Sequence, residues 1–186
     1  ETLQNNKNHV LMSSFTIFDV INMVQLSGGK PVFYDSKSKF SPLVSLKKLK
    51  VEYTEKIGAI IVTHYHRSNQ EIKAVASWCK ENNILLLEDC AISLGSFIDK
   101  KHVGSFGDMG FYSFGLFKFA PAYIGGAMYI KNKDIRIKIE KKLIKSKKIE
   151  EKDIRPYFLN GIKLDILTNK LIFNYFTFPI FRWGYL

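Results

Sequence analysis

Two residues in the middle of the chain have side chains suited to catalysis. Asp89 follows Glu88 and four apolar residues, a position where a carboxylate costs free energy unless it has a partner. Lys118 lies between Phe117 and Phe119, and a lysine amine in apolar surroundings can attack a carbonyl carbon. Each residue alone also has an ordinary structural interpretation. Asp89 would then be a helix cap or an ion-paired carboxylate, and Lys118 an amine that reaches solvent along its apolar stem.

A hydroxyl and a glycine pair lie near Lys118 in the sequence. Ser113 precedes Lys118 by five residues, and Gly125 and Gly126 follow it. Hydroxyls and free backbone N–H groups are what a phosphate group needs. Together with Asp89, this set matches the requirements for holding pyridoxal phosphate. The acid would pair with the pyridinium nitrogen and keep the ring an electron sink, while the lysine would form a Schiff base.

The segments before Asp89 predict the elements that position it. Residues 32–35 and 59–63 have the composition of buried strands. Ser68-Asn69-Gln70-Glu71 has the pattern of a capping box, and it opens a predicted helix that ends near residues 81–83. The apolar residues of this helix recur at helical spacing; they are Ile72, Val75, Ala76 and Cys79.

A second unbroken apolar strand is predicted over residues 84–87. Residues 59–88 thus form a strand, helix, strand unit of the length that a parallel crossover requires. Continuous apolar residues indicate that both faces of the sheet are covered. The sequence therefore predicts an α/β fold with a mostly parallel central sheet flanked by helices. Its functional residues, Asp89 and His64 among them, are expected at the carboxyl ends of the strands.

Further strands are expected over residues 110–114 and 126–130, linked by the loop that contains Lys118. Residues 134–149 are predicted to form a long, Lys-rich helix. Its apolar residues are expected on one side; they are Ile135, Ile139, Leu143 and Ile144. Beyond Asp153 the periodic pattern weakens, and no further element is predicted there.

An ordered set of motifs over roughly residues 10–131 resembles the DegT/DnrJ/EryC1/StrS aminotransferases, which are sugar aminotransferases of fold type I. The set runs Leu87-Glu88-Asp89-Cys90-Ala91, then Val103-Gly104-Ser105-Phe106-Gly107-Asp108, Tyr112-Ser113-Phe114, Lys118 and Gly125-Gly126-Ala127. Upstream, Ser14-Phe15-Thr16, residues 27–35 and Ile60-Ile61-Val62-Thr63-His64 continue the resemblance in the same order.

The resemblance implies a fold, a cofactor and roles for individual residues. The fold would be the large domain of an aspartate-aminotransferase-like enzyme, with pyridoxal 5'-phosphate as cofactor. Asp89 would contact the pyridine nitrogen, Ser113 the phosphate, and Lys118 would form the Schiff base and carry the proton. Glutamate would donate the amino group to a keto sugar nucleotide in polysaccharide or modified-sugar biosynthesis, and the full-length protein would be a homodimer.

The resemblance also implies a division of the chain, which begins at Glu1 and ends in an aromatic run, and which we interpret as a fragment. Residues 1–150 would belong to the cofactor-binding large domain without its N-terminal phosphate loop. Residues 151–186 would begin a C-terminal region or packing segment that is cut short.

At four positions the chain departs from the family pattern. Ile92 stands where the family usually has Gln or His, which steadies the ring hydroxyl of the cofactor, and Ile17 stands where an aromatic residue usually stacks on the ring. Phe18 or Phe15 is expected to supply that stacking. Phe119 and Ile124 replace a usual Asn and Glu. Two interpretations remain open: a divergent working aminotransferase, or a catalytically impaired member that acts as a binding or structural protein.

The formal net charge is +11, and the excess of Lys lies between Lys131 and Lys152. Such a run is usually a solvated helix face, and it lacks the interleaved aromatics or motif expected of a nucleic-acid partner. One alternative is a peripheral membrane or polyanion-binding protein built on this run and the aromatic C-terminus. Its signature would be salt-sensitive binding to acidic vesicles or nucleic acid that survives Lys118→Ala.

The cysteines and histidines do not indicate a metal site. Cys79 and Cys90 are the only cysteines, and their spacing suggests neither a disulfide framework nor a metal site, which fits a reducing cytoplasm. His64 is expected either to line the cofactor pocket or to be a structural core residue, and His66 and His102 are expected in surface loops. No apolar run reaches the ~20 residues that span a bilayer, so no stable membrane insertion is expected.

Overall fold

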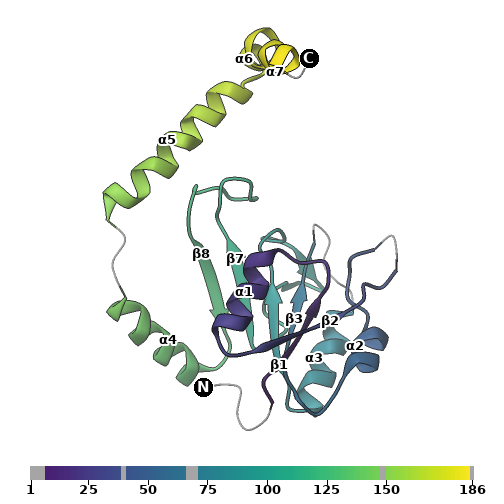
Figure 1. Cartoon of the computed structure of the whole chain (residues 1–186). Coiled ribbons are helices and arrows are strands. Elements are labelled where there is room, and N and C mark those ends of the chain that lie inside the picture. The colour runs from purple at the N-terminus through teal and green to yellow at the C-terminus, as the bar shows by residue number, and fades with distance from the viewer. Residues whose placement is uncertain (1–6, 39–40, 66–70, 147–149, 185–186) are drawn as a thin grey trace.

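A computed structural model describes residues 7–38, 41–65, 71–146 and 150–184, and it centres on a six-stranded sheet (Figure 1). The strand order is β2-β1-β3-β4-β7-β8. The strands are β1 (His9–Ser13), β2 (Lys30–Tyr34), β3 (Ile57–Thr63), β4 (Leu85–Asp89), β7 (Met109–Ser113) and β8 (Gly126–Ile130). The first five strands are parallel, and β8 pairs antiparallel with β7. The predicted mostly parallel α/β sheet is therefore confirmed.

The predicted strand, helix, strand unit is confirmed as β3, α3 (Ile72–Glu81) and β4. Val75 and Cys79 of α3 are fully buried, and β3 and β4 pair in parallel from Ala59 with Leu85 to Thr63 with Asp89. This register brings the ends of the two strands together at one edge of the sheet. The capping box expected at residues 68–71 lies mostly outside the described residues.

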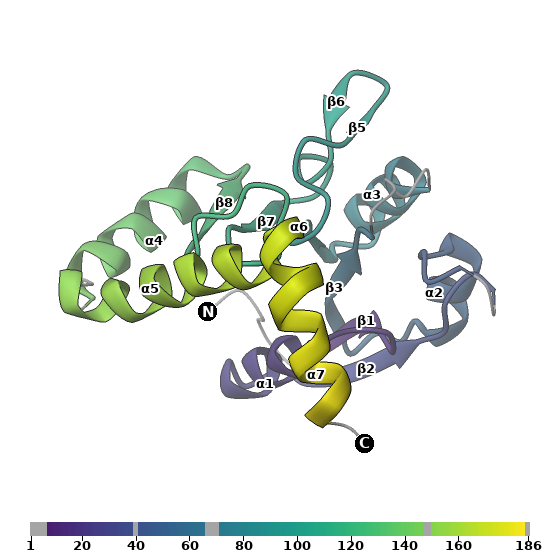
Figure 2. The ribbon, with the colours of Figure 1, turned by 90° about the horizontal axis from the view of Figure 1, so that it is seen from above.

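Successive strand residues pack on opposite faces of the sheet, as the pleat requires. Leu11, Ile60 and Leu86 lie in one core cluster, together with Leu49 of α2 (Leu46–Glu52) and the buried residues of α3. The neighbouring strand residues, such as Val10, Met12 and Ile61, form a second cluster with Val24 of α1 (Phe18–Leu26). Thus α2 and α3 cover one face and α1 covers the other, as Figure 2 shows from above.

The expectation of a buried strand at residues 32–35 was only partly right, because Tyr34 is buried but its neighbours in the strand are not. β2 is the edge strand of the sheet, and Phe33 is 42% exposed. The reason is topological, because β1 inserts between β2 and β3 and no described strand lies beyond β2. A short antiparallel hairpin, β5 (Phe97–Ile98) and β6 (Lys101–His102), projects from the body between β4 and β7.

The chain leaves the sheet through α4 (Lys133–Lys145), which Asn132 caps by accepting hydrogen bonds from the N–H groups of Asp134 (2.8 Å) and Ile135 (3.1 Å). The helix expected over residues 134–149 therefore ends at Lys145, and residues 147–149 lie outside the described part. No residue of α4 is buried, so the expected solvated, Lys-rich face is confirmed.

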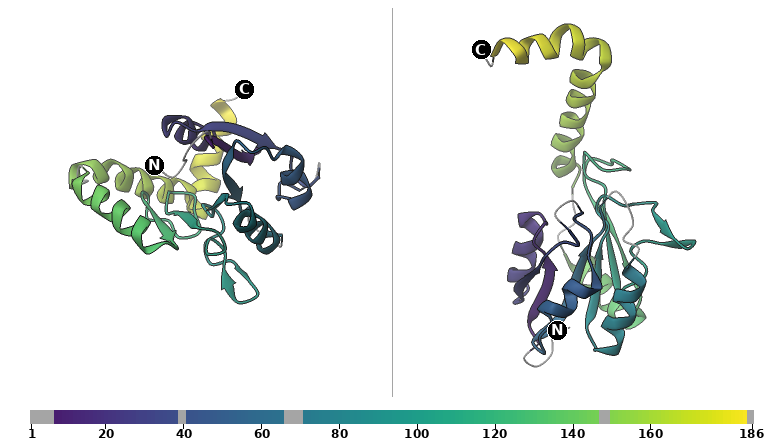
Figure 3. Two further views of the ribbon diagram at one scale, coloured as in Figure 1. Left: turned by 90° about the horizontal axis from the view of Figure 1, so that it is seen from below. Right: turned by 90° about the vertical axis from the view of Figure 1, so that its right-hand side faces the viewer.

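The segment after Asp153, for which no element was expected, is helical. It contains α5 (Glu151–Thr168), α6 (Lys170–Ile172), the π-helical turn η1 (Phe173–Thr177) and α7 (Phe178–Gly184). In Figure 3 (right) α5 extends away from the sheet, and the segment from α6 to α7 turns across its far end. Among the described residues, none of the helices combines the length and the apolar character needed to cross a bilayer.

Candidate active site

A cavity of about 350 Å³ opens at the carboxyl edge of the parallel strands, where ligands bind in open α/β sheets. Its walls come from the segments that follow β1, β3 and β4 and from the loop between β7 and β8. The lining residues are Phe15, Thr16, Ile17, Thr63, Tyr65, Asp89, Ala91, Ile92 and Lys118. The sequence-predicted pair Asp89 and Lys118, 29 positions apart in the chain, thus faces one cavity.

Asp89 is the last residue of β4, which lies between β3 and β7 inside the sheet. Its side chain is half-buried, and its Oδ1 accepts a hydrogen bond from the backbone N–H of Ala91 at 3.0 Å. This local bond fixes the direction of the carboxylate where the strand ends. An acidic group is therefore presented to the cavity from a rigid strand rather than from a loop.

Lys118 reaches the cavity because the loop between β7 and β8 folds back on itself. The N–H of Lys118 donates to the carbonyl oxygen of Gly115 at 3.1 Å, and the N–H of Phe114 donates to that of Gly125 at 2.9 Å. Gly125 has a φ of +103°, a conformation that other residues rarely adopt. Gly126 lies so close to Tyr112 that a Cβ would come within 2.5 Å of its carbonyl oxygen.

Ser113 is the last residue of β7 and is half-buried. Its hydroxyl accepts a hydrogen bond from the N–H of Gly115 at 3.4 Å. A Cβ on Gly115 would lie 3.6 Å from Ser113 Oγ and 3.9 Å from Lys118 Cγ, so the hydroxyl and the lysine stem flank the same glycine. Ser113 is not among the residues that line the cavity.

Of the two aromatic residues predicted to stack on the cofactor, only Phe15 lines the cavity. Phe18 is the first residue of α1, is 72% exposed and does not line it. The ring of Phe15 lies 5.4 Å from that of Tyr65, centroid to centroid, and the hydroxyl of Tyr65 donates a hydrogen bond to the carbonyl oxygen of Phe15. The structure thus favours Phe15 over Phe18 as the aromatic wall.

Tyr65 is a residue of the cavity that sequence reasoning missed. Burial raises the pKa of its phenol, hydrogen bonds with Ser13 and Thr63 act against that rise, and the nearby charge of Asp89 adds to it. The net shift is upward, so the hydroxyl stays protonated near neutral pH and acts as a donor. Its place two residues after the predicted strand at 59–63 was the available signal.

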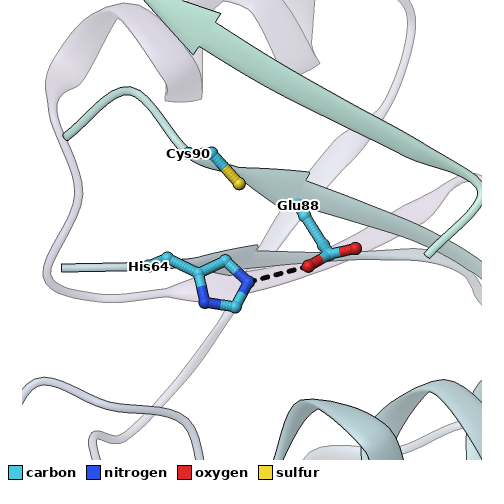
Figure 4. Close-up of side chains that lie close together, drawn as sticks. All are labelled: His64, Glu88 and Cys90. Atoms are coloured by element: carbon cyan, nitrogen blue, oxygen red, sulfur yellow. Dashed lines mark hydrogen bonds and ion pairs between the residues drawn. The ribbon is translucent and has the colours of Figure 1, made fainter. Parts of the chain in front are cut away.

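Beneath the cavity, His64 and Glu88 form a completely buried pair (Figure 4). Nε2 of His64 lies 2.9 Å from Oε2 of Glu88, and the carboxylate also accepts hydrogen bonds from the N–H groups of Gly104 (2.9 Å) and Gly107 (2.6 Å). Burial raises the pKa of Glu88, but these hydrogen bonds and the charge of His64 outweigh burial and lower it. Glu88 is therefore ionised, and it accepts a hydrogen bond from Nε2–H of His64.

The pair joins three segments under the site. His64 follows β3, Glu88 belongs to β4, and Gly104 and Gly107 lie in the loop before β7. His64 thus takes the structural role that the sequence had left open, since it does not line the cavity. His102, expected in a surface loop, is exposed on β6, and His66 lies outside the described residues.

Cys90 completes a group of three possible metal ligands with His64 and Glu88, whose ligand atoms lie within 4.8 Å of one another. The spacing of these residues in the sequence had not suggested such a group. They come together only because β3 and β4 are neighbours in the sheet. Burial, followed by the charge of Glu88, raises the pKa of the Cys90 thiol to about 12. With the thiol protonated and three hydrogen bonds already on Glu88, the group is a hydrogen-bonded part of the core.

Of the four positions that depart from the family pattern, some line the cavity and others do not. Ile92 and Ile17 line the cavity, so apolar groups face it where the family pattern has polar and aromatic side chains. Phe119 is 65% exposed and does not line the cavity, and Ile124 is half-buried in the same loop. Only two of the four departures therefore change the walls of the site.

Comparisons with known proteins identify relatives of this chain. The chain is 31% identical over 128 residues to a GDP-perosamine synthase of Vibrio cholerae, covering 69% of this chain and 34% of that protein. It is 32% identical over 146 residues to a UDP-4-amino-4,6-dideoxy-N-acetyl-beta-L-altrosamine transaminase of Campylobacter jejuni subsp. jejuni, covering 77% and 38%. The chain thus spans about a third of the length of these curated relatives.

Solved structures share the fold. The aminotransferase PseC of Helicobacter pylori, involved in the biosynthesis of pseudoaminic acid, superposes with a TM-score of 0.67 at 25% identity, over 72% of this chain and 36% of that one. The aminotransferase TlmJ of Streptoalloteichus hindustanus gives a TM-score of 0.69 at 23% identity, over 73% and 36%. These matches confirm the large-domain fold of fold type I aminotransferases.

The profile of one family covers most of the chain. It matches residues 3–160, which include every strand of the sheet, Asp89, Ser113 and Lys118. The match ends within α5, so residues 161–184 lie beyond it. The chain belongs to the DegT/DnrJ/EryC1/StrS aminotransferase family.

Proposed function

We propose that the full-length protein is a pyridoxal-phosphate-dependent aminotransferase that moves an amino group from glutamate to a keto sugar nucleotide. The observation that carries the proposal is that Asp89, at the end of β4, and Lys118, in the loop between β7 and β8, line one cavity at the carboxyl edge of the sheet. A carboxylate and an amine that share an apolar cavity serve no evident folding purpose, whereas an electron-withdrawing cofactor needs both.

The residues of the cavity fit pyridoxal phosphate. A volume of about 350 Å³ lies within the range of small-molecule sites. Phe15, Ile17 and Ile92 provide apolar walls for the ring, and Asp89 provides the acid for the ring nitrogen. The predicted phosphate contact, Ser113, lies outside the lining of the cavity, at the end of β7. When bound, the cofactor supplies a ring that withdraws electrons from the substrate carbon.

The chain's own groups have distinct tasks in this reaction. Asp89 would face the ring nitrogen of the bound cofactor, where a carboxylate held in place by Ala91 N–H would favour the protonated nitrogen. Lys118 would hold the cofactor through its Nζ, and the same amine would carry the proton at the Cα of the amino donor. The apolar walls exclude water from that proton transfer.

The acceptor is inferred from relatives. The curated relatives are named for reactions on nucleotide-linked amino sugars, among them GDP-perosamine synthase and a UDP-linked altrosamine transaminase. This supports a keto sugar nucleotide as acceptor and a role in polysaccharide or modified-sugar biosynthesis. We also keep as proposals the homodimer and the cytoplasmic location implied by the family.

A second candidate is a catalytically impaired member that keeps the fold as a binding or structural protein. Ile92 favours it, because this residue lines the cavity and cannot hydrogen-bond to the ring hydroxyl of the cofactor. The two candidates differ in one measurable property, which is whether glutamate reacts with the cofactor held by Lys118.

The test is the visible absorbance of the full-length protein with added pyridoxal phosphate, followed by L-glutamate. We expect a band that needs Lys118, is absent in Lys118→Ala, and is bleached by glutamate. Lys133→Ala, which removes an exposed lysine of α4, is the matched control and should keep the band. A band that survives Lys118→Ala would contradict the proposal, and a Lys118-dependent band that glutamate leaves unchanged would favour the impaired member.

A further inference from the structure

Tyr65 lines the cavity but has no task in the proposed function. The polar side chains of the lining are those of Thr16, Thr63, Tyr65, Asp89 and Lys118. Asp89 and Lys118 are assigned to the ring nitrogen and to the carbonyl carbon of the cofactor. The ring of pyridoxal phosphate also carries a hydroxyl group beside that carbonyl carbon, and an oxygen taken out of water needs a hydrogen-bond partner. The three remaining hydroxyl side chains are the candidates for this partner.

The segment after β4 supplies no such partner through Ile92, whose side chain has no polar atom. The neighbouring segment is the one after β3, because β3 and β4 pair in parallel with Thr63 opposite Asp89. Tyr65 lies two residues beyond Thr63, and Ile92 lies three residues beyond Asp89. The two side chains thus enter one cavity from adjacent segments, past paired ends of two strands.

The phenol oxygen of Tyr65 lies near the acid of the cavity. The charge of Asp89 acts on it, and hydrogen bonds join it to the hydroxyls of Ser13 and Thr63, at the ends of β1 and β3. The hydroxyl of Thr63 is therefore already in use. Thr16 belongs to the segment after β1, and β3 separates β1 from β4. Of the three hydroxyl side chains, that of Tyr65 is thus the best placed to act beside Asp89.

The phenol has one proton to donate. Burial is the main cause that raises the pKa of Tyr65, so this proton is present near neutral pH. In the structure the hydroxyl donates to the carbonyl oxygen of Phe15. Phe15 is 62% exposed, so water can satisfy its carbonyl group when the phenol donates to a ligand instead. Rotation of the hydroxyl hydrogen is enough for this exchange of partners.

We infer that Tyr65 donates a hydrogen bond to the ring hydroxyl oxygen of pyridoxal phosphate and so makes the polar contact that Ile92 cannot make. The inference rests on the proposed function, because it requires the cofactor in this cavity. Its consequence concerns the choice between the two candidate functions. Ile92 is the residue that favours a catalytically impaired member, and a contact from Tyr65 removes that reason.

The first test compares the affinity of the full-length protein for pyridoxal phosphate and for 3-deoxypyridoxal phosphate, which lacks the ring hydroxyl. Tyr65→Phe removes only the phenol oxygen. We expect it to raise the dissociation constant of pyridoxal phosphate at least about tenfold, because the ring oxygen loses its donor inside the cavity. The dissociation constant of the 3-deoxy analogue should change by less than about twofold. Isothermal titration calorimetry measures both constants.

The matched control is Tyr157→Phe, which removes the phenol oxygen of a 51% exposed tyrosine of α5 that does not line the cavity. It should leave both dissociation constants within about twofold of their original values. Thr16→Val removes the competing hydroxyl of the cavity and is measured with the same two compounds. Thermal melting of each variant checks that the fold is retained.

The second test is spectroscopic. A hydrogen-bond donor stabilises the anionic form of the oxygen that accepts it. With saturating pyridoxal phosphate, Tyr65→Phe should therefore raise the pH midpoint at which the Lys118-dependent absorbance band changes, by about one unit. Asp89 and Lys118, the charged side chains of the lining, stay the same in this variant. Tyr157→Phe should leave the midpoint where it is.

Three results would overturn the inference. The first is an equal loss of affinity for both compounds in Tyr65→Phe, which would show that the phenol only holds Phe15 in place. The second is no change in affinity or midpoint. The third is a loss in Thr16→Val that is selective for pyridoxal phosphate, with none in Tyr65→Phe, which would assign the contact to Thr16. Absence of any Lys118-dependent band in the unaltered protein would instead refute the proposed function, and the inference with it.

Discussion

At the scale of residues, the site combines groups that the sequence places far apart. Asp89 ends β4, Lys118 lies in the loop after β7, and Phe15 and Tyr65 come from the segments after β1 and β3. Below them the buried Glu88 fixes the ends of β3 and β4 through His64 and the backbone of Gly104 and Gly107. Consecutive residues Glu88 and Asp89 thus have different tasks, because successive strand residues face opposite sides of the sheet.

Asp89→Asn tests the role of the carboxylate in the cavity. The amide cannot carry the negative charge that stabilises a protonated ring nitrogen, so we expect the first half-reaction with glutamate to slow by about 100-fold or more. Single-turnover absorbance after rapid mixing measures this rate. Asp99→Asn is the control, since Asp99 is an exposed acid near the β5-β6 hairpin. A rate for Asp89→Asn close to that of Asp99→Asn would contradict the assigned role.

Glu88→Gln tests the buried pair. Removing one charge of a buried, hydrogen-bonded pair typically costs about 3–5 kcal/mol, and we expect a loss of that size in the free energy of unfolding, measured with urea. Glu52→Gln, at the exposed end of α2, should change it by less than about 0.5 kcal/mol. An equal effect of the two substitutions would show that the pair does not hold the strands.

Glu88 also predicts how stability depends on pH. Its pKa is lowered in the folded protein from the ordinary value of 4.5. A carboxyl group with a lowered pKa contributes stability that is present above its unfolded pKa and is lost as the pH falls through its folded pKa. We therefore expect the protein to lose stability below about pH 4.5 more steeply than Glu88→Gln does. The melting temperatures of the protein and of Glu88→Gln, measured over the same pH range, test this prediction. Equal losses in the two below about pH 4.5 would contradict it.

At the scale of elements, one close backbone contact shapes the Lys118 loop. A Cβ at Gly126 would come 2.5 Å from the carbonyl oxygen of Tyr112, on the neighbouring strand β7. Gly115, in the same loop, has only ordinary contacts at 3.6 and 3.9 Å and no positive φ. The antiparallel pairing of β7 with β8, and with it the position of Lys118, therefore depends on Gly126.

We expect Gly126→Ala to destabilise the protein by about 1–3 kcal/mol, because the backbone of β8 must move away from β7. It should also reduce the Lys118-dependent absorbance band. Gly115→Ala, which has space for its methyl group, should change stability by less than about 0.5 kcal/mol. Melting temperatures and spectra of the two variants distinguish these outcomes, and a greater effect of Gly115→Ala would refute the account of the loop.

The elements that could be predicted from sequence are those whose local pattern agrees with their environment. The unbroken apolar segments of β3 and β4 and the periodic apolar residues of α3 are buried as expected. No strand was expected over β1, although it has five residues, as β4 does. β2 is an edge strand that local composition does not distinguish from an inner one. The distal part of α5 was missed because its apolar residues are exposed instead of facing the core.

The residues of the site could also be predicted only in part from the sequence. Asp89 and Lys118 could be found from residue type, apolar neighbours and the resemblance to a family. Other features of the site could not be found from the sequence, because each depends on which strands are neighbours. These features are the place of Tyr65, the choice of Phe15 over Phe18 and the pairing of His64 with Glu88. The sheet order decides those contacts, and no local spacing in the sequence encodes it.

At the scale of the whole molecule, the chain joins a family fold to a segment that the family match does not cover. The sheet and the cavity lie within residues 3–160, and the helices from α6 to α7 lie beyond them. Tyr123 connects the two parts, since it follows Lys118 in its loop and packs against Gly161 of α5.

The central claim is that Lys118 is the residue that bonds to pyridoxal phosphate. Borohydride reduction of the full-length protein with added cofactor fixes that bond, and mass spectrometry of the digested protein identifies the modified lysine. We predict a single pyridoxyl group on Lys118 and none in Lys118→Ala. Modification spread over the exposed lysines of α4, with Lys118 unmodified, would contradict the account.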